Sequence, residues 1–198
     1  MAALVLDHAI FLHVPKTGGT WVTSALREQG LVRATIFSAE GADHPTIETV
    51  RYASPLRIIS TVREPVGWLQ SYWRFFHARA WRTSSRAPIP CLDTLMDLAA
   101  PDFQTFAARY VTRRPGHITS LLQAYTEGAA HVCRQESLLT DLEAAFDACA
   151  QPYLHEVFAR RPHENVSRSF DITCSEETTR AIREVDRWVL EQFYPEQL

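Results

Sequence analysis

Lysine is almost absent from this chain: Lys16 is the only one, and the other 19 of the 20 basic residues are arginines. The formal net charge is −3 and the pI is about 6.2, which does not favour a generally basic protein that binds nucleic acid. A lysine carries a compact ammonium group on a flexible stem, whereas the arginine guanidinium is a rigid fork. We therefore expect Lys16 to contact a single oxygen of an anionic ligand as a point charge.

Long apolar runs and paired cysteines are also missing. No stretch approaches eighteen consecutive apolar residues, so no membrane span is expected. The N-terminus has no basic region, and Asp7 and His8 interrupt its apolar run, which favours a strand over a signal peptide. The cysteines are scattered without a Cys-x-x-Cys pair, which favours buried thiols in a reducing compartment over a zinc site or a disulfide framework. We expect a soluble, cytoplasmic protein. The four cysteines are Cys91, Cys133, Cys149 and Cys174.

Length and periodicity predict one α/β domain over residues 1–198, because 46% hydrophobic residues can build one well-buried core. Short apolar runs at 9–14 and 56–62 predict buried strands, and each is followed by a helical pattern, over 20–29 and from Pro65 to about Ala80. This alternation favours a central parallel sheet flanked by helices. Weaker signals predict a further strand at 31–37, a short helix over 45–52 and a helix-rich C-terminal half. In that half, helices are expected at 91–99, 103–111, 118–125, 140–149 and 175–193, with a strand at 130–134.

The segment Pro15-Lys-Thr-Gly-Gly-Thr-Trp21 follows the first predicted strand. Its two glycines let backbone N–H groups turn inward, and Thr17 and Thr20 add hydroxyl groups. A helix that begins near Thr20 would direct its free N–H groups and positive dipole end to the same place. The expected ligand is a phosphate or another tetrahedral oxyanion. A Walker loop, in which lysine follows Gly-x-x-x-x-Gly, does not occur in the chain.

A second oxyanion motif follows the strand at 56–62. Arg63 comes at the end of this strand, where ligands of open α/β sheets gather. Ser71 lies eight residues later in the predicted helix. An arginine fork with a nearby hydroxyl is a plausible clamp for a second phosphate.

Both motifs, in this order, resemble those of sulfotransferases that use 3′-phosphoadenosine 5′-phosphosulfate (PAPS). The resemblance implies a P-loop-like sulfotransferase fold that binds PAPS without a metal, with the carbohydrate-type branch as one candidate within the family. Lys16, Thr17, Gly18, Gly19 and Thr20 would then hold the 5′-phosphosulfate, and Trp21 would stack on the adenine. Arg63 and Ser71 would hold the 3′-phosphate. Glu136 and the segment 163–167 resemble family positions only loosely. The family also has a cofactor-binding loop late in its sequence, which is not clearly present here, and Arg160, Arg161 and Arg168 are weak substitutes for it.

Sulfuryl transfer also needs a base for the proton of the acceptor hydroxyl or amine. Histidine is the side chain most readily neutral near pH 7, and His44 lies in a polar loop where the carbohydrate-type branch often keeps its base. His13 and Glu40 remain alternatives for the base.

A stretch from Pro65 to Leu92 that contains arginines and no acidic residue suits an anionic small ligand. The expected acceptor is a small molecule or carbohydrate, and aromatic residues between Trp73 and Trp81 line either an acceptor cleft or, more commonly for helical spacing, the core.

Two other function classes stay open. A protein that binds phosphorylated nucleotides without catalysis would retain both phosphate motifs and transfer no sulfate. A nucleotide kinase would need a Walker loop and a carboxylate that binds magnesium, and the position of Lys16 disfavours it. The sequence does not identify the acceptor or the oligomeric state.

Overall fold

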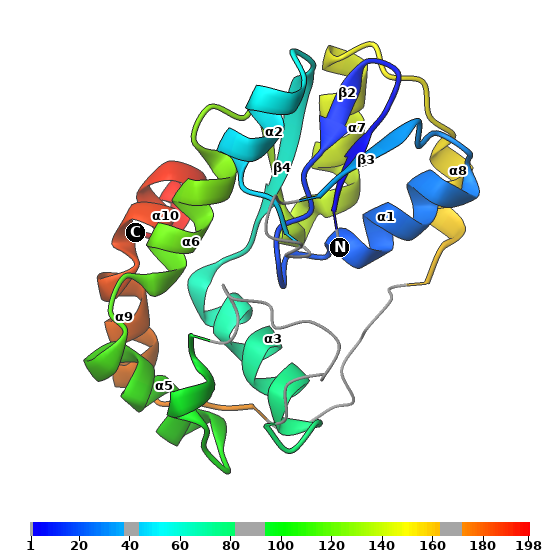
Figure 1. Cartoon of the computed structure of the whole chain (residues 1–198). Helices are drawn as coiled ribbons and strands as arrows, with labels where there is room; N and C mark the ends of the chain where they lie inside the picture. Colours follow the sequence, from blue (N-terminus) through cyan, green and yellow to red (C-terminus); the bar gives the residue numbers. More distant parts are fainter. Residues whose placement is uncertain (1, 38–43, 82–93, 163–171) are drawn as a thin grey trace. The chain divides into compact units, whose positions relative to one another are not determined.

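The computed structural model describes residues 2–37, 44–81, 94–162 and 172–198 (Figure 1). These residues fold into two compact units. The first unit takes residues 1–63 and 123–165, and the second takes residues 64–122 and 166–198. The chain therefore leaves the first unit directly after Arg63 and re-enters it within a helix.

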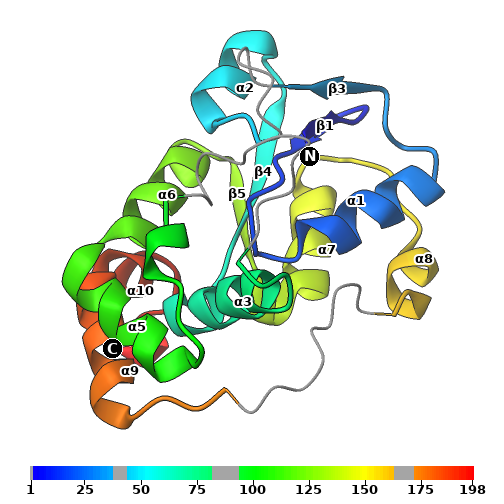
Figure 2. The ribbon, with the colours of Figure 1, turned by 60° about the horizontal axis from the view of Figure 1, so that its bottom comes forward.

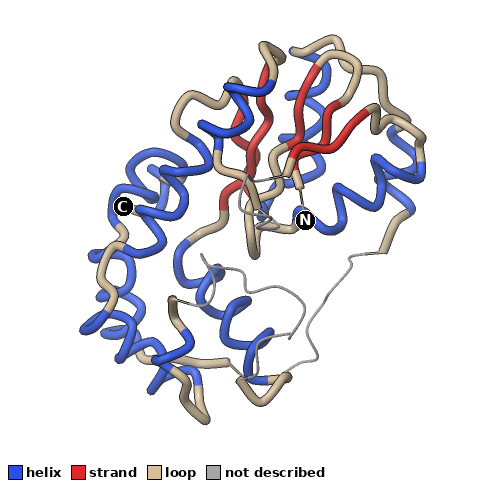
Figure 3. The backbone as a smooth tube through the Cα atoms, viewed as in Figure 1, coloured by secondary structure: helices blue, strands red, loops and turns tan. Residues whose placement is uncertain are grey.

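The first unit contains a five-stranded sheet with the strand order β3-β1-β2-β4-β5. Strands β2, β4 and β5 are parallel, whereas β1 runs antiparallel to both of its neighbours, β2 and β3. Figure 3 shows the strands as one layer. Their bounds are β1 Ala3–Val5, β2 Ala9–Phe11, β3 Ala34–Ile36, β4 Arg57–Val62 and β5 His131–Arg134.

The expected α/β class with flanking helices is confirmed, but the expectation of a parallel sheet is wrong for β1 and β3. The apolar residues before Asp7 form β1, and a tight turn closed by the Leu6 N–H to the Ala9 carbonyl at 2.9 Å folds it back on β2. A connection this short can only join antiparallel strands. The weak strand signal at 31–37 becomes β3, which then pairs antiparallel with β1 at the sheet edge.

Helices α1, α7 and α8 cover one face of this sheet, and α2 lies on the other side of β4 (Figures 1 and 2). The core on the first face joins Phe11 and Ile59 of the sheet to Trp21, Phe146 and Phe158 of the helices. Burial of side chains of this size stabilises the fold by about 1.5–3 kcal/mol each. The helical bounds are α1 Gly19–Glu28, α2 Ile47–Ala53, η2 Gln135–Ser137, α7 Leu138–Ala148 and α8 His155–Arg160.

The second unit is helical, and α3, α5 and α9 pack on one another. Aromatic rings fill the space between α3 and α5: Tyr72 stacks on Phe106 with centroids 5.7 Å apart and an interplanar angle of 12°. Trp73 and Phe76 are buried as well, which confirms the core interpretation for these two aromatic residues. The bounds are α3 Pro65–His77, η1 Met96–Leu98, α5 Phe103–Arg113, α6 His117–Thr126, α9 Glu176–Val185, α10 Arg187–Phe193 and η3 Pro195–Gln197. Of these, α6 continues into the first unit.

The long final helix expected at 175–193 is wrong, because Asp186 divides it into α9 and α10. The Asp186 side chain is fully buried and accepts hydrogen bonds from the Tyr110 hydroxyl at 2.6 Å and from the Thr119 N–H at 2.9 Å. Burial raises the pKa of this carboxyl group. The carboxylate thus accepts from a backbone N–H in the first turn of α6 that has no partner within its own helix. The backbone at Asp186 leaves the helical conformation, and this places the carboxylate at α6.

Other sequence expectations have mixed outcomes. Cys133, Cys149 and Cys174 are free, and burial raises the pKa of the Cys133 thiol to about 12, so this thiol is inert. Cys91 lies outside the described residues. The helix expected at 91–99 is represented in the described part only by η1. In the ranges that the structure describes, no helix has both the length and the apolar character needed to cross a membrane.

Candidate functional site

The loop between β2 and α1 makes a tight left-handed turn. Lys16 has φ = 67° and Gly18 has φ = 87°. Glycine adopts this conformation without cost, but a lysine there loses about 1–2 kcal/mol to contact between its Cβ and the backbone. Such strain persists only where the surrounding structure fixes it, and it clusters at functional sites.

The Thr17 side chain fixes the loop to the sheet. It is fully buried, and its hydroxyl donates to the Val14 carbonyl at 2.9 Å. Its oxygen lies 2.5 Å from the Thr61 hydroxyl of β4, and since the Thr17 proton is used for Val14, Thr61 is the donor in this contact. Thr17 was predicted to bind the cofactor. Its hydroxyl is engaged within the protein, so its backbone N–H is the group that remains for that role.

The first turn of α1 presents backbone donors beside this loop. Gly18 precedes the helix in the left-handed conformation, and among the described residues no side chain caps the N-terminus. Lys16, Gly18 and Thr20 are partly exposed, whereas Thr17 and Gly19 are buried. The positive end of the dipole of this ten-residue helix therefore lies at the loop that carries Lys16. A tetrahedral oxyanion fits this set of donors.

Gly19 is needed for close packing against His13. A Cβ added at Gly19 would lie 2.6 Å from the His13 Cδ2 atom. The imidazole is only 3% exposed and has little room to move away. Burial, followed by the proximity of His44 and Lys16, holds the pKa of His13 well below its usual value, so this ring is neutral.

Gly19→Ala should lower the free energy of unfolding by about 1–3 kcal/mol, the usual cost of overpacking a buried position. Chemical denaturation of the single variants and of the His13→Ala/Gly19→Ala double variant measures the effect. The double variant should lose less stability than the sum of its parts, because the smaller side chain removes the clash. Additive losses would contradict the contact.

The structure brings Arg63 next to the Lys16 loop. Strands β2 and β4 are parallel neighbours, with Phe11 opposite Ile59, so the residues that follow both strands emerge at the same edge of the sheet. The Arg63 Nη1 donates to the Lys16 carbonyl at 3.5 Å, which is at the long end for a hydrogen bond. Arg63 as a residue is partly exposed, although its Nε is buried. Lys16 and Arg63, 47 residues apart in sequence, therefore lie next to each other in the first unit.

His44 contacts His13, which lies just before the Lys16 loop. The two imidazole rings meet edge to face with centroids 5.3 Å apart. The His44 Nδ1 lies 3.3 Å from the His13 carbonyl oxygen, and because a carbonyl only accepts, Nδ1 carries the proton. In the neutral ring Nε2 is then the basic nitrogen. The Tyr125 hydroxyl donates to the His44 carbonyl at 3.2 Å and fixes the backbone at this point.

Trp21, the predicted adenine partner, lies in the core of the first unit. It is 6% exposed, its ring is 5.4 Å from that of Phe158, and its Nε1 donates to the Arg161 carbonyl at 3.4 Å. Arg160 and Arg161 both form ion pairs with Glu28. The Arg161 backbone therefore contacts Trp21, and the role of Arg160 and Arg161 as substitutes for the late cofactor loop stays a prediction. Adenine stacking by Trp21 stays a prediction.

The remaining predicted residues are placed as follows. Ser71 lies in α3 of the second unit and is partly exposed, and its role beside Arg63 stays a prediction. Glu136 lies in η2, directly after β5. The alternative base Glu40, the segment 163–167 and Arg168 lie outside the described residues. Where the structure is described, three or more His, Cys, Asp or Glu side chains do not gather in a way that would hold a metal ion.

Two features of the site were missed at the level of sequence: the contact between His13 and His44, and the hydroxyl pair of Thr17 and Thr61. The strand register contains a signal for Thr61. Phe11 pairs with Ile59, so His13 and Thr61, each two positions later, lie near the same edge of the sheet, and Thr61 is still within β4. The position of His44 carries no such signal, because the polar sequence before it has no periodic pattern.

Comparison with known proteins gives no relative: no protein-family model, no curated protein and no solved structure matches the chain.

Proposed function

We propose that the protein is a PAPS-dependent sulfotransferase with a P-loop-like fold. The observation that carries the proposal is the meeting of Lys16 and Arg63 at the ends of the parallel strands β2 and β4. PAPS has two separated anionic groups, a 5′-phosphosulfate and a 3′-phosphate, and the two motifs offer separate cations for them. When bound, PAPS supplies the sulfuryl group that passes to an acceptor hydroxyl or amine.

The loop residues bind and polarise the anion in this proposal. Backbone N–H groups of the turn from Lys16 to Thr20 and the N-terminus of α1 surround one phosphate. The Lys16 ammonium meets negative charge as it grows on the phosphate oxygen that leaves, and this interaction is stronger in the transition state than in the ground state. Arg63, with Ser71, holds the 3′-phosphate through charge-assisted hydrogen bonds.

His44 is the proposed base. Its proton lies on Nδ1, directed at the His13 carbonyl, so Nε2 is the nitrogen that takes the acceptor proton. His13, with its depressed pKa, is the weaker base of the pair and packs the ring of His44 into place. The acceptor is proposed to be a small molecule or a carbohydrate, and the cytoplasmic location stays a prediction.

A non-catalytic protein that binds phosphorylated nucleotides is the second candidate. One observation favours it: His44 is only 7% exposed, so an acceptor hydroxyl has limited access to the proposed base. The oxyanion loop does not depend on this histidine.

Adenosine 3′,5′-bisphosphate should bind markedly more tightly than 5′-AMP, because only the bisphosphate engages Arg63 and Ser71. Arg63→Ala should remove this preference at a cost of about 1.5–3 kcal/mol, the value for a hydrogen bond to a charged group. Isothermal titration calorimetry with both nucleotides measures the difference. Arg27→Ala is the matched control, since Arg27 is an exposed arginine of the same unit that lies in the last turn of α1. Equal affinities of the wild-type protein for both nucleotides would overturn the proposed cofactor.

A further inference from the structure

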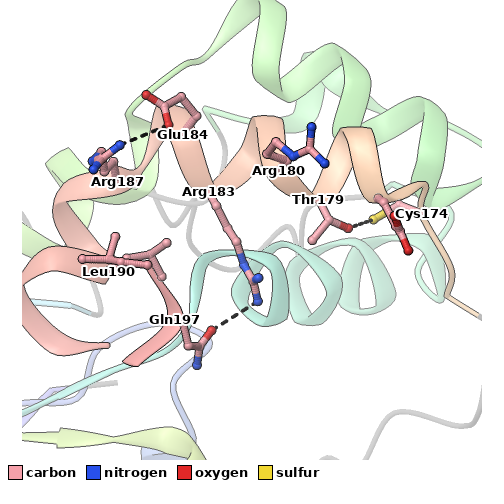
Figure 4. A pocket seen from close by; sticks show the side chains of 10 residues that line it. Cys174, Thr179, Arg180, Arg183, Glu184, Arg187, Leu190 and Gln197 are labelled. Carbon is pink, nitrogen blue, oxygen red and sulfur yellow. Dashed lines mark hydrogen bonds and ion pairs between the residues drawn. The ribbon is translucent and has the colours of Figure 1, made fainter. Parts of the chain in front are cut away.

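The second unit contains a cavity between α9, α10 and η3 that the proposed reaction does not use. Its volume is about 410 Å³. Three arginines, Arg180, Arg183 and Arg187, contribute to its lining, together with Leu190 and Gln197 (Figure 4). A cavity with several guanidinium groups beside an apolar wall is suited to an organic anion.

Arg183 is held in a fixed orientation at this cavity. Its Nε donates to the Glu64 carboxylate at 3.1 Å, and its Nη2 donates to the Gln197 side-chain oxygen at 3.2 Å. Glu64 in turn accepts from the Gly67 N–H at 2.9 Å as the N-cap of α3. Figure 4 shows Arg183 extending from α9 toward Gln197. These contacts leave Nη1 of Arg183, with its two hydrogens, as a preorganised donor.

Arg180 lies one turn before Arg183, on the same side of α9. Within the described ranges it has no hydrogen bond or ion pair, and it is exposed. The acidic residues at the cavity are Glu176 and Glu184, and Glu184 forms an ion pair with Arg187 at 3.6 Å. Arg180 therefore brings a positive charge that Glu184 does not neutralise.

The lining of the cavity is also partly apolar. Leu190 of α10 and Leu198 both line it, and Leu198, which is 64% exposed, offers most of this surface because Leu190 is only 2% exposed. The Thr179 hydroxyl is already engaged with the Cys174 sulfur at 3.1 Å, so it adds little polarity. The Gln197 amide nitrogen offers one more donor group beside Arg183. Charge and apolar surface thus lie at separate places in one cavity.

We propose that this cavity binds a small oxyanion carried on a short aliphatic chain. Arg180 and the Nη1 of Arg183 contact the oxyanion, and the exposed side chain of Leu198 contacts the aliphatic chain. The cavity belongs to the second unit, whereas the loop proposed to bind PAPS belongs to the first.

Hexyl phosphate is a suitable probe, and calorimetry in the presence of saturating adenosine 3′,5′-bisphosphate keeps it out of the proposed cofactor site. We expect one hexyl phosphate per chain, with hexanol and inorganic phosphate each binding at least tenfold more weakly. Arg180→Ala should weaken binding by about tenfold or more, the effect of one charge-assisted contact. Arg113→Ala, which removes another exposed arginine of the second unit that does not line the cavity, should leave binding within twofold.

Equal affinities of the Arg180→Ala and Arg113→Ala variants, or no binding to the wild-type protein, would overturn the proposal. Arg180 is exposed and makes no internal contact in the described chain, so the variant should fold, and circular dichroism confirms this. Arg183→Lys is a second variant that keeps the positive charge but loses the planar guanidinium fork, and it should also weaken the binding of hexyl phosphate. Failure of the protein to bind the bisphosphate would contradict the proposed function. The hexyl phosphate affinities of the Arg180→Ala and Arg113→Ala variants could still be compared, so the two proposals are tested separately.

Discussion

Lys16→Ala should lower turnover in sulfuryl transfer by about 10²–10³-fold, the usual cost of removing one donor that stabilises charge in the transition state. Binding of adenosine 3′,5′-bisphosphate should weaken far less, because the contact strengthens only as charge develops on the leaving oxygen. Rapid-mixing kinetics with PAPS, together with calorimetry of the bisphosphate, separates the two effects. Lys16→Arg should also be poorly active, since a planar fork does not replace a point charge.

The left-handed backbone at Lys16 requires a control for strain. Alanine keeps the strain of φ = 67°, whereas glycine relieves it. Lys16→Gly should therefore be as inactive as Lys16→Ala if the ammonium group is what matters. Recovery of turnover in the glycine variant would show that the backbone, not the ammonium, caused the loss. If the Lys16→Ala variant kept its turnover but lost most of its affinity for the bisphosphate, Lys16 would contribute to ground-state binding only.

His44→Ala should remove most of the chemical rate, on the order of 10²–10⁴-fold, while bisphosphate binding barely changes. The reason is that Nε2 of His44 is the proposed proton acceptor and the phosphate contacts come from other residues. In the wild-type protein, activity should fall on the acid side with one ionisation, because a protonated base cannot accept the proton. Single-turnover kinetics across a pH series measures both effects. His155→Ala is the matched control, since this histidine is exposed and paired with Glu143.

The competing assignments give distinct outcomes. If His44→Ala remains active and His13→Ala or Glu40→Gln loses turnover with the cofactor still bound, the base has been misassigned. If all three variants keep the rate, the acceptor hydroxyl is acidic enough to need little help, as a phenol is. Tyr125→Phe removes only the hydrogen bond to the His44 carbonyl, so it should reduce the rate less than loss of the imidazole.

Local pattern was sufficient to predict the parts of the fold that place the oxyanion loop. The apolar runs before Lys16 and Arg63 are buried strands, and α1 begins at Gly19, one residue from its expected start. Parallel pairing of β2 with β4 followed from the alternation of strands and helices. Because adjacent parallel strands end at one edge of the sheet, the proximity of Lys16 and Arg63 was implicit in the sequence.

Features that depend on tertiary contacts could not be predicted in this way. The antiparallel β1 is three residues long, too short for a periodic pattern. The break at Asp186 arises because its carboxylate turns inward to Tyr110 and Thr119, which are 76 and 67 residues away in sequence. The contact of His44 with His13 joins residues 31 positions apart, and the polar sequence before His44 has no periodic pattern that would predict it. Burial of Trp21 depends on Phe158, a residue from a distant helix.

Sulfuryl transfer itself tests the central claim most directly. The wild-type protein and Lys16→Ala would be incubated with PAPS and a mixture of phenol, sugar and amine acceptors, and mass spectrometry would detect both an acceptor that gains one SO₃ group and the matching adenosine 3′,5′-bisphosphate. We expect both products in equal amounts with the wild-type protein, and a strong decrease with Lys16→Ala. Tight binding of the bisphosphate with intact PAPS and unmodified acceptors would contradict it and would favour a non-catalytic nucleotide-binding protein.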